Sequence, residues 1–262
     1  MERFGDVSVT VDDQHVALVE INRPPHNFFS LSMLGDLADA FEAVDADGRS
    51  RCIVLAAEGK NFCAGAELAE NNPKLTSARS DAKPDRHIYD EAVRLFSVGI
   101  PAVAAVQGAA VGGGLGLACM TDFRVGGPGT RMTANFARLG FHQGFGLSVT
   151  LPAIVGQQAA LELLYTGKRI KGEEAAELGL LDRFVADDGI RATAVELAAE
   201  IAASAPLAIR SIRETMRGHL PEAIRAATDR ERAEQERLTA TADWAEGVKA
   251  MAQRRTPAFT GR

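Results

Sequence analysis

The stretch that decides the fold is Pro101-Ala-Val-Ala-Ala-Val-Gln-Gly-Ala-Ala-Val-Gly-Gly-Gly-Leu-Gly-Leu-Ala-Cys-Met-Thr-Asp122. Its first third is a short apolar run without helical periodicity, which predicts a buried strand. Gly108 and the glycine triplet at 112–114 follow, and residues 115–120 can form a helix. The first N–H groups of such a helix have no partner within it and face outward. The stretch therefore predicts a place that holds a negative, or developing negative, oxygen.

The glycines also have a purely structural interpretation, in which they only let the helix and the strand pack closely. Two nucleotide-binding motifs fail on spacing. The G-x-G-x-x-G pattern would need a glycine where Leu117 stands, and G-x-x-x-x-G-K-[ST] occurs nowhere in the chain. A dinucleotide or P-loop site is therefore not expected.

Length and composition indicate an ordered globular protein, with one large domain or one domain plus an appendage. Charged residues make up 24% of the 262 residues, and the net charge of −6 argues against a nucleic-acid surface. No apolar run reaches the roughly 18 residues of a membrane span and the N-terminus does not resemble a signal peptide, so we expect a cytoplasmic protein without a membrane partner. Cys52, Cys63 and Cys119 are expected to be buried thiols, and the scattered histidines predict no metal site.

Strands and helices alternate along the first part of the chain, which predicts an α/β layered core. A β-hairpin is expected at 7–11 and 16–21, a helix capped by Ser30 after it, and a buried strand at 52–57. Small residues lead from that strand through 61–68, and an amphipathic helix is expected at 87–98. Between them, the polar residues 71–86 are expected to form a mobile lid. After the glycine-rich stretch we expect another strand starting at Asp122, a loop at 133–146, helices at 157–165 and 172–178, and a short strand at 181–185.

From Gly189 onward the pattern is helical almost throughout. We expect helices at 190–204, 206–217, 221–241 and 243–253, the last with Asp243 and Glu246 as a capping box. This tail carries more apolar positions than its short helices can cover, among them Leu207, Ile209, Ile212, Met216, Ile224 and Trp244. Such a tail is typical of a subunit interface.

Five short segments, spread over nearly the whole chain, match the motifs of one known family. They are Ile21-Asn-Arg-Pro-Pro25, Asn61-Phe-Cys-Ala-Gly-Ala-Glu-Leu68, Gln107-Gly-Ala-Ala-Val-Gly-Gly-Gly-Leu-Gly-Leu117, Thr166-Gly-Lys-Arg-Ile-Lys-Gly-Glu-Glu-Ala-Ala-Glu-Leu-Gly-Leu180 and Arg255-Thr-Pro-Ala-Phe-Thr-Gly-Arg262. The first resembles the loop after the opening hairpin of the crotonase (enoyl-CoA hydratase/isomerase) superfamily. The others resemble its motifs F-x-A-G-A-D-L, N-G-x-x-x-G-G-G-x-E-L, T-G-x-x-I-x-A-x-E-A-x-x-x-G-L and R-x-P-x-F-x-G-R. One match alone would be weak support, but five in the right order identify the chain as a member.

The resemblance implies an α/β fold, a crotonase-like spiral of ββα units with a C-terminal helical trimerisation region. Residues 1–200 would form the acyl-CoA-binding core and residues 201–262 the oligomerisation region of a homotrimer or a dimer of trimers. The implied ligand is an acyl-CoA thioester, and no separate cofactor is expected because coenzyme A is part of the substrate.

The resemblance also implies roles for single residues. The N–H groups of Ala66 and Gly113 would polarise the thioester carbonyl. Arg23 and His26 are candidates for the CoA phosphates and adenine, and the main chain around Ala64 for the adenine edge. Phe259, with Arg254 and Arg255, would contact the nucleotide of a neighbouring subunit. A basic residue common in the family three positions past the first donor is absent, because Ala69 stands there.

The chain departs from the family where two glutamates handle water and a proton, because Gly116 and Phe136 stand at these positions. An aspartate used by dienoyl isomerases, near Gly144, is also missing. His142 and Gln143 lie in the turn that faces the acyl group in the family, and an imidazole can transfer a proton near neutral pH. A histidine hydrogen-bonded within its own turn is the competing interpretation. Other ionisable candidates, each with a solvated or structural alternative, are Glu67, Asp81, Asp85, His87 and Tyr89, whereas Asp122 and Arg124 are expected to be structural.

Two classes of function stay open at this point. The first is an enoyl-CoA hydratase/isomerase family enzyme that stabilises an enolate in an oxyanion hole, by a reaction other than the two-glutamate hydration. The second is a non-catalytic acyl-CoA-binding protein that has lost its acid–base groups. Within the enzyme class, decarboxylation or hydrolysis of an acyl-CoA is the alternative reaction. A panel of enoyl-, malonyl- and β-ketoacyl-CoA substrates would separate these hypotheses.

Overall fold

The computed structural model describes residues 1–66 and 86–262. The predicted lid at 71–86 therefore lies outside the described residues, except for Arg86. Glu67, Ala69, Asp81 and Asp85 lie outside them as well.

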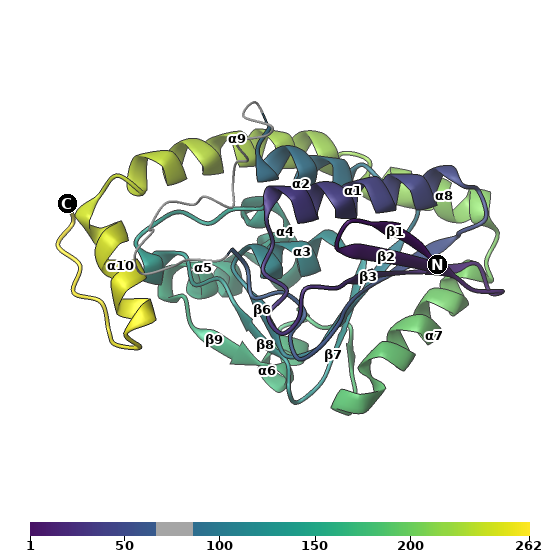
Figure 1. Ribbon diagram of the computed structural model, residues 1–262, viewed down its shortest axis with the longest axis horizontal. Coiled ribbons are helices and arrows are strands. Elements are labelled where there is room, and N and C mark those ends of the chain that lie inside the picture. The colour runs from purple at the N-terminus through teal and green to yellow at the C-terminus, as the bar shows by residue number, and fades with distance from the viewer. Residues whose placement is uncertain (67–85) are drawn as a thin grey trace.

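The largest element of the described chain is a seven-stranded sheet with strand order β1-β2-β3-β4-β5-β7-β10 (Figure 1). The first three strands pair antiparallel, and β3, β4, β5, β7 and β10 run parallel. The predicted opening hairpin is confirmed, and β1 precedes it. The strands are β1 (Glu2–Phe4), β2 (Val7–Val11), β3 (Val16–Ile21), β4 (Cys52–Ala57), β5 (Ala102–Val106), β7 (Phe123–Gly126) and β10 (Arg183–Phe184).

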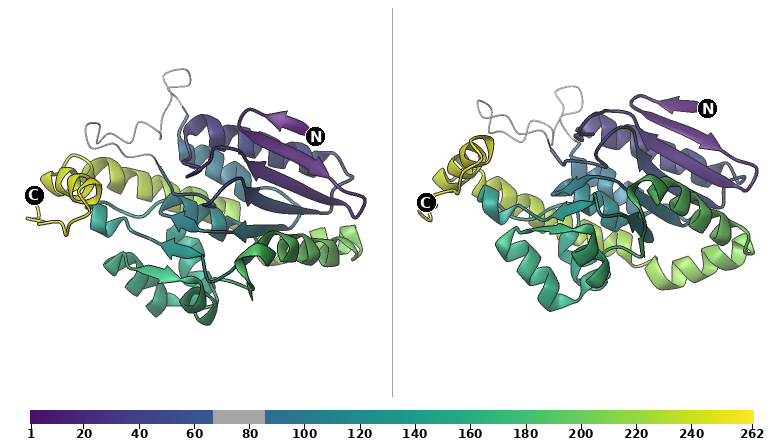
Figure 2. Two further views of the ribbon diagram at one scale, coloured as in Figure 1. Left: turned by 60° about the horizontal axis from the view of Figure 1, so that its bottom comes forward. Right: turned by 90° about the horizontal axis from the view of Figure 1, so that it is seen from below.

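Helices cover both faces of this sheet (Figure 2). On one face lie α1 (Leu31–Ala46) and α2 (Ile88–Phe96), and on the other lies α7 (Ile190–Ala202). The sequence of β4 is apolar throughout because both faces of the strand are buried. Ile53 and Leu55 pack in the core under α1, whereas Cys52 and Val54 pack in the core under α7. A parallel strand buried on both faces requires such a run.

A three-stranded sheet of order β6-β8-β9 carries the glycine-rich stretch. It consists of β6 (Ala109–Val111), β8 (Arg131–Thr133) and β9 (Arg169–Lys171), and helix α3 (Gly113–Met120) starts two residues after β6 ends. The predicted strand–turn–helix is thus confirmed. An isolated parallel bridge between Cys63 and Ala110 places residues 63–66 beside this turn.

The remaining helices enclose the small sheet and extend to the C-terminus. They are α4 (Leu147–Val155), α5 (Gln157–Thr166), α6 (Gly172–Glu177), α8 (Pro206–Arg217), α9 (Leu220–Leu238) and α10 (Ala242–Ala252), with short 3₁₀ helices at Ala137–Leu139 (η2) and Asp187–Gly189 (η3). The four helices predicted for the tail are confirmed. Helix α4 was not predicted, because its apolar run contains Pro152, which normally interrupts a helix.

The capping-box prediction for α10 was wrong. Thr241 caps this helix, because its Oγ1 accepts a hydrogen bond from the Trp244 N–H at 3.2 Å. The carboxylate of Asp243 instead accepts from the Thr260 N–H at 2.7 Å. Glu246 likewise accepts from the Ala258 N–H at 2.8 Å. Both acidic side chains therefore hold the C-terminal segment rather than the helix end.

Part of the apolar surface expected for an interface is covered within the chain. Ile224 is fully buried and Trp244 is 2% exposed. Leu207, Ile212 and Met216 remain exposed on α8. Among the described helices, no single one is long and apolar enough to cross a bilayer; residues 187–202 and 206–238 pass that test only when taken together across a bend of 105°.

Candidate active site

Two backbone segments made of small residues lie side by side at the start of α3. The Cys63 N–H donates to the Ala109 carbonyl at 3.0 Å, and the Val111 N–H donates to the Cys63 carbonyl at 3.0 Å. Gly65 has φ +83°, and a Cβ atom there would lie 2.6 Å from the Val111 carbonyl oxygen. Only glycine permits this approach. Both segments consist of small residues because their backbones approach each other too closely for larger side chains.

The N–H groups of Ala66 and Gly113 are both unpartnered within the described chain: no backbone or side-chain acceptor receives a hydrogen bond from either. Gly113 is the first residue of α3, where an N–H has no acceptor inside the helix. Both residues line one cavity. Two backbone N–H donors in the wall of one cavity can both donate to a substrate oxygen on which negative charge develops.

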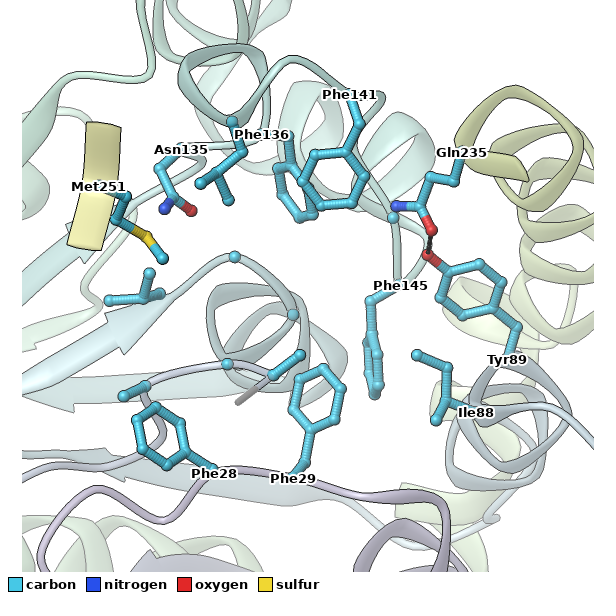
Figure 3. A pocket seen from close by; sticks show the side chains of 18 residues that line it. Phe28, Phe29, Ile88, Tyr89, Asn135, Phe136, Phe141, Phe145, Gln235 and Met251 are labelled. Carbon is cyan, nitrogen blue, oxygen red and sulfur yellow. Dashed lines mark hydrogen bonds between the residues drawn. The ribbon is translucent and has the colours of Figure 1, made fainter. Parts of the chain in front are cut away.

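This cavity has a volume of about 240 Å³ and a mainly aromatic wall (Figure 3). Around it lie the rings of Phe28, Phe29, Phe136, Phe141 and Phe145. Polar side chains line it at two places. Asn135 lies beside Met251 at one end, and Tyr89 with Gln235 lies at the other.

Tyr89 and Gln235 join α2 to α9 at the cavity wall. The Tyr89 hydroxyl donates to Gln235 Oε1 at 2.7 Å, and Gln235 Nε2 donates to the His142 carbonyl at 2.9 Å. Burial is the main reason why the pKa of Tyr89 lies well above its usual value, with the negative charge of Glu231 adding to the shift. The hydroxyl therefore stays protonated in the neutral pH range.

The two positions at which the resemblance predicts glutamates differ in their exposure to the cavity. Phe136 lines it, and its ring lies 5.4 Å from that of Phe141. Gly116 is buried in α3, and a Cβ atom there would lie 2.7 Å from Phe145 Cβ. Neither residue supplies an ionisable group.

His142 and Gln143 do not belong to the cavity wall formed by the described residues, although their neighbours Phe141 and Gly144 do. The His142 ring Nδ1 lies 2.9 Å from the Gln143 carbonyl oxygen. Gln143 Nε2 donates to Ser148 Oγ at 3.0 Å. Both side chains are thus bound within their own turn, and their role at the acyl group stays a prediction.

The loop predicted to meet coenzyme A adjoins the cavity through Phe28. Arg23 forms an ion pair with Asp6 at 3.3 Å, and the exposed His26 ring lies 5.2 Å from the Phe28 ring. The Ala64 N–H already donates to the His26 carbonyl at 2.9 Å, which leaves the Ala64 carbonyl for a ligand. Phe259 is 42% exposed on the C-terminal segment.

A basic groove beside the cavity was not predicted. Its volume is about 600 Å³, and it shares Val111, Asn135, Leu139 and Met251 with the cavity. Its arginines are Arg138, Arg169, Arg254 and Arg255. Arg255 is bound by Glu246, whereas the other three form no ion pair with a carboxylate in residues 1–66 or 86–262. The sequence carried no signal for Arg138 and Arg169, because the fold alone brings η2 and β9 together.

Asp122 and Arg124, which were expected to be structural, form ion pairs within the chain. Asp122 binds Arg213 and Arg217 at 3.2 Å, and Arg124 binds Asp182 at 2.7 Å. All three cysteines are free and buried, as expected. Within the described ranges, no three His, Cys, Asp or Glu side chains gather in a way that would hold a metal ion.

Comparison with known proteins identifies the family. The family model for enoyl-CoA hydratase/isomerase matches residues 12–262. The chain belongs to the enoyl-CoA hydratase/isomerase family. It is 32% identical to a putative enoyl-CoA hydratase/isomerase of Bacillus subtilis, over 98% of this chain and all of the relative. It is 36% identical to a probable enoyl-CoA hydratase of Mycobacterium tuberculosis, over 83% of each chain.

The fold agrees with this family. The crystal structure of an enoyl-CoA hydratase/isomerase from Pseudoalteromonas atlantica superposes with a TM-score of 0.86 at 27% identity, covering 97% of this chain and all of the other. The crotonase resemblance and the α/β crotonase-like fold are therefore confirmed.

Proposed function

We propose that this enoyl-CoA hydratase/isomerase family protein binds an acyl-CoA thioester and stabilises its enolate. The observation that carries the proposal is the pair of unpartnered N–H groups, on Ala66 and Gly113, in the wall of one apolar cavity. A carbonyl oxygen that receives both hydrogen bonds gains most when negative charge develops on it, because the donors are already oriented in a site with little water.

The basic groove supports binding of the CoA phosphates. In a chain of net charge −6, Arg138, Arg169 and Arg254 form a local positive patch that continues from the cavity. Guanidinium groups pair well with phosphate oxygens. Arg23 and His26 belong to the loop that adjoins the cavity through Phe28, so they offer further basic side chains for the nucleotide.

The reaction is proposed to differ from hydration by two glutamates. In the described part of the cavity wall the only titratable side chain is Tyr89, and its hydroxyl stays protonated. Hydration needs groups that deliver a hydroxide and a proton, and such assistance is typically worth about 10²–10⁴ in rate. We therefore expect weak or absent hydration of short enoyl-CoAs.

The test is a substrate panel on the purified protein. Calorimetry with crotonyl-CoA measures binding, and turnover is followed for crotonyl-CoA, malonyl-CoA and a β-ketoacyl-CoA. Binding of at least one thioester in the micromolar range is expected, and absence of any binding would refute the pocket assignment. Turnover of one substrate identifies an enzyme, whereas binding alone identifies the acyl-CoA-binding alternative. Where turnover is found, its loss in His142→Ala would support the imidazole as proton carrier.

A further inference from the structure

The turn at 144–146 holds a bulky residue in an unfavourable backbone conformation. Phe145 has φ +61°, in the left-handed region, and Gly146 after it has φ +73°. A side chain with a Cβ atom is strained there, so the conformation persists only where the surroundings enforce it. Outliers of this kind concentrate at functional sites, and Phe145 lines the cavity.

Buried polar groups from α2 and α9 enforce this conformation. Glu231, which is 1% exposed, accepts from the Gly146 N–H at 2.9 Å and from the Ser148 N–H at 3.1 Å. The Tyr89 hydroxyl lies directly against this turn, since a Cβ atom on Gly144 would collide with it, and it donates to Gln235 Oε1 at 2.7 Å. The hydrogen bonds of the turn therefore fix the direction of the Phe145 side chain.

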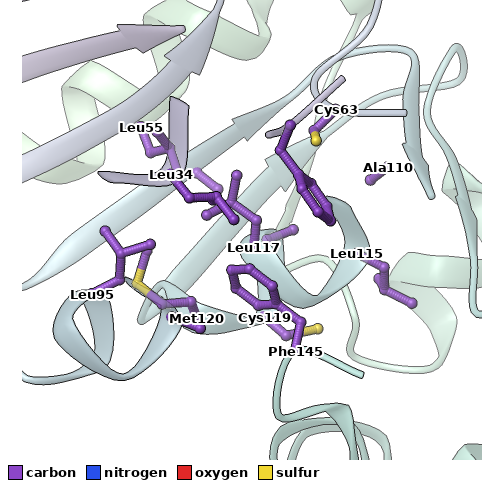
Figure 4. Close-up of a cluster of buried hydrophobic side chains, with 14 of the residues drawn as sticks. Leu34, Leu55, Cys63, Leu95, Ala110, Leu115, Leu117, Cys119, Met120 and Phe145 are labelled. Carbon is purple, nitrogen blue, oxygen red and sulfur yellow. The ribbon is translucent and has the colours of Figure 1, made fainter. Parts of the chain in front are cut away.

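The turn presses the Phe145 ring against α3 (Figure 4). A Cβ atom at Gly116 would lie 2.7 Å from Phe145 Cβ and 3.0 Å from its Cδ1, which is closer than side chains pack. The ring therefore occupies the place that a side chain at position 116 would need. Glycine at 116 and phenylalanine at 145 form a matched pair.

The same ring bounds the space beside the carbonyl site. Phe29 lies 6.0 Å from Phe145 between ring centroids, and its ring occupies the place of a Cβ atom on Gly113. The two rings thus form an apolar floor next to the Gly113 donor (Figure 3). A thioester whose carbonyl binds there has its first acyl carbons over this floor.

We infer that Phe145 determines acyl specificity: its ring, seated on Gly116, admits acyl groups that are unbranched at the carbon next to the thioester carbonyl and excludes those that carry a methyl branch there. This inference rests on the proposed acyl-CoA binding. It also means that Gly116→Glu alone cannot restore a glutamate at this position, because the new side chain collides with Phe145.

A double-mutant cycle tests the pair. Gly116→Ala should lower the melting temperature in the native background, because the methyl group displaces Phe145. In the Phe145→Gly background, which lacks both the ring and the Cβ atom at 145, the same change should raise it, because alanine favours a helix over glycine. Gly35→Ala is the matched control, since Gly35 lies inside α1 and its Cβ would meet no atom closer than 3.9 Å. It should be stabilising in both backgrounds. Equal effects of Gly116→Ala in both backgrounds would overturn the pairing.

Calorimetry with crotonyl-CoA and 2-methylcrotonyl-CoA tests the specificity. The native protein should prefer the unbranched thioester, and Phe145→Ala should shift the preference toward the branched one by about tenfold, equivalent to ~1.4 kcal/mol. Phe145→Leu, which keeps a full-sized apolar side chain, should shift it less. An unchanged preference in Phe145→Ala overturns the inference. If the native chain binds neither thioester, the proposed function and the specificity both fail, while the melting-temperature cycle still decides whether the residues are paired.

Discussion

At the scale of single residues, the proposed chemistry depends on the N–H of Gly113. Gly113→Ala and Gly113→Pro both place a Cβ atom within 2.4 Å of the Phe29 ring, but only proline removes the N–H. Proline is well tolerated at the first position of a helix, so α3 should persist. We expect the proline variant to lose about 10²-fold more turnover than the alanine variant, or correspondingly more affinity, as measured by kinetics or calorimetry. Equal losses in the two variants would show that the N–H is not used.

A second prediction for a single residue concerns the buried hydrogen bond of the Tyr89 hydroxyl in the cavity wall. Tyr89→Phe leaves the Gln235 Oε1 without this donor in a buried site. The free energy of unfolding should fall by about 1–3 kcal/mol, measured by denaturant titration. Tyr165→Phe is the control, because Tyr165 is 74% exposed and should not affect stability. A Tyr89→Phe protein as stable as the native one would contradict the network.

At the scale of elements, the C-terminal segment is held to α10 by a charge that depends on pH. Two hydrogen bonds from the Arg255 guanidinium and one from the Ala258 N–H lower the pKa of Glu246 to about 2. Because the folded pKa lies below the ordinary 4.5, this stabilisation is complete above pH 4.5 and is lost as the pH falls toward 2. The protection factors of the amides in residues 255–262, which correct for the slower intrinsic exchange in acid, should therefore fall as the pH drops from 4.5 toward 2.

The matched variant for this element is Glu246→Gln. It should lower the protection factors of residues 255–262 already at neutral pH and remove most of their further fall in acid. Protection factors of native and variant protein that respond to acid in the same way would mean that another group controls the segment.

At the scale of the whole molecule, α8 is held by ion pairs of its arginines and leaves several large apolar side chains exposed. Arg210 binds Asp45 at 2.6 Å, and Arg213 binds Asp122 at 3.2 Å. On the same helix, Leu207 and Met216 are 80% and 68% exposed. A helix anchored in this orientation indicates an interface with further copies of the chain.

We therefore predict that the protein forms trimers or hexamers through the exposed face of α8. The double substitution Leu207→Glu, Ile212→Glu places charge on this face and should yield smaller species at micromolar concentration by sedimentation or light scattering. Tyr165→Glu, at an exposed apolar site on α5, should leave the assembly unchanged. A native protein that sediments as a monomer would refute the prediction.

The sequence by itself determined what depends on neighbouring residues. The hairpin at 7–21, the helix capped by Ser30, the glycine turn into α3 and the four tail helices follow from alternation, caps and backbone freedom, which act over a few positions. The motif order also identified the family, because each motif is a continuous segment. The donor roles of Ala66 and Gly113 were predicted from the same resemblance, since each residue lies within one of these segments.

Only the tertiary structure decided what depends on contacts between distant segments. No local pattern places Glu231 under the turn at 146, the Phe145 ring on Gly116, or Arg138 and Arg169 in one groove. Likewise, Asp243 and Glu246 had the spacing of a cap, but the C-terminal segment folds back and takes their carboxylates. The physical reason is the same throughout: propensity is set by neighbours in the chain, whereas packing and hydrogen-bond partners are set by which elements meet in space.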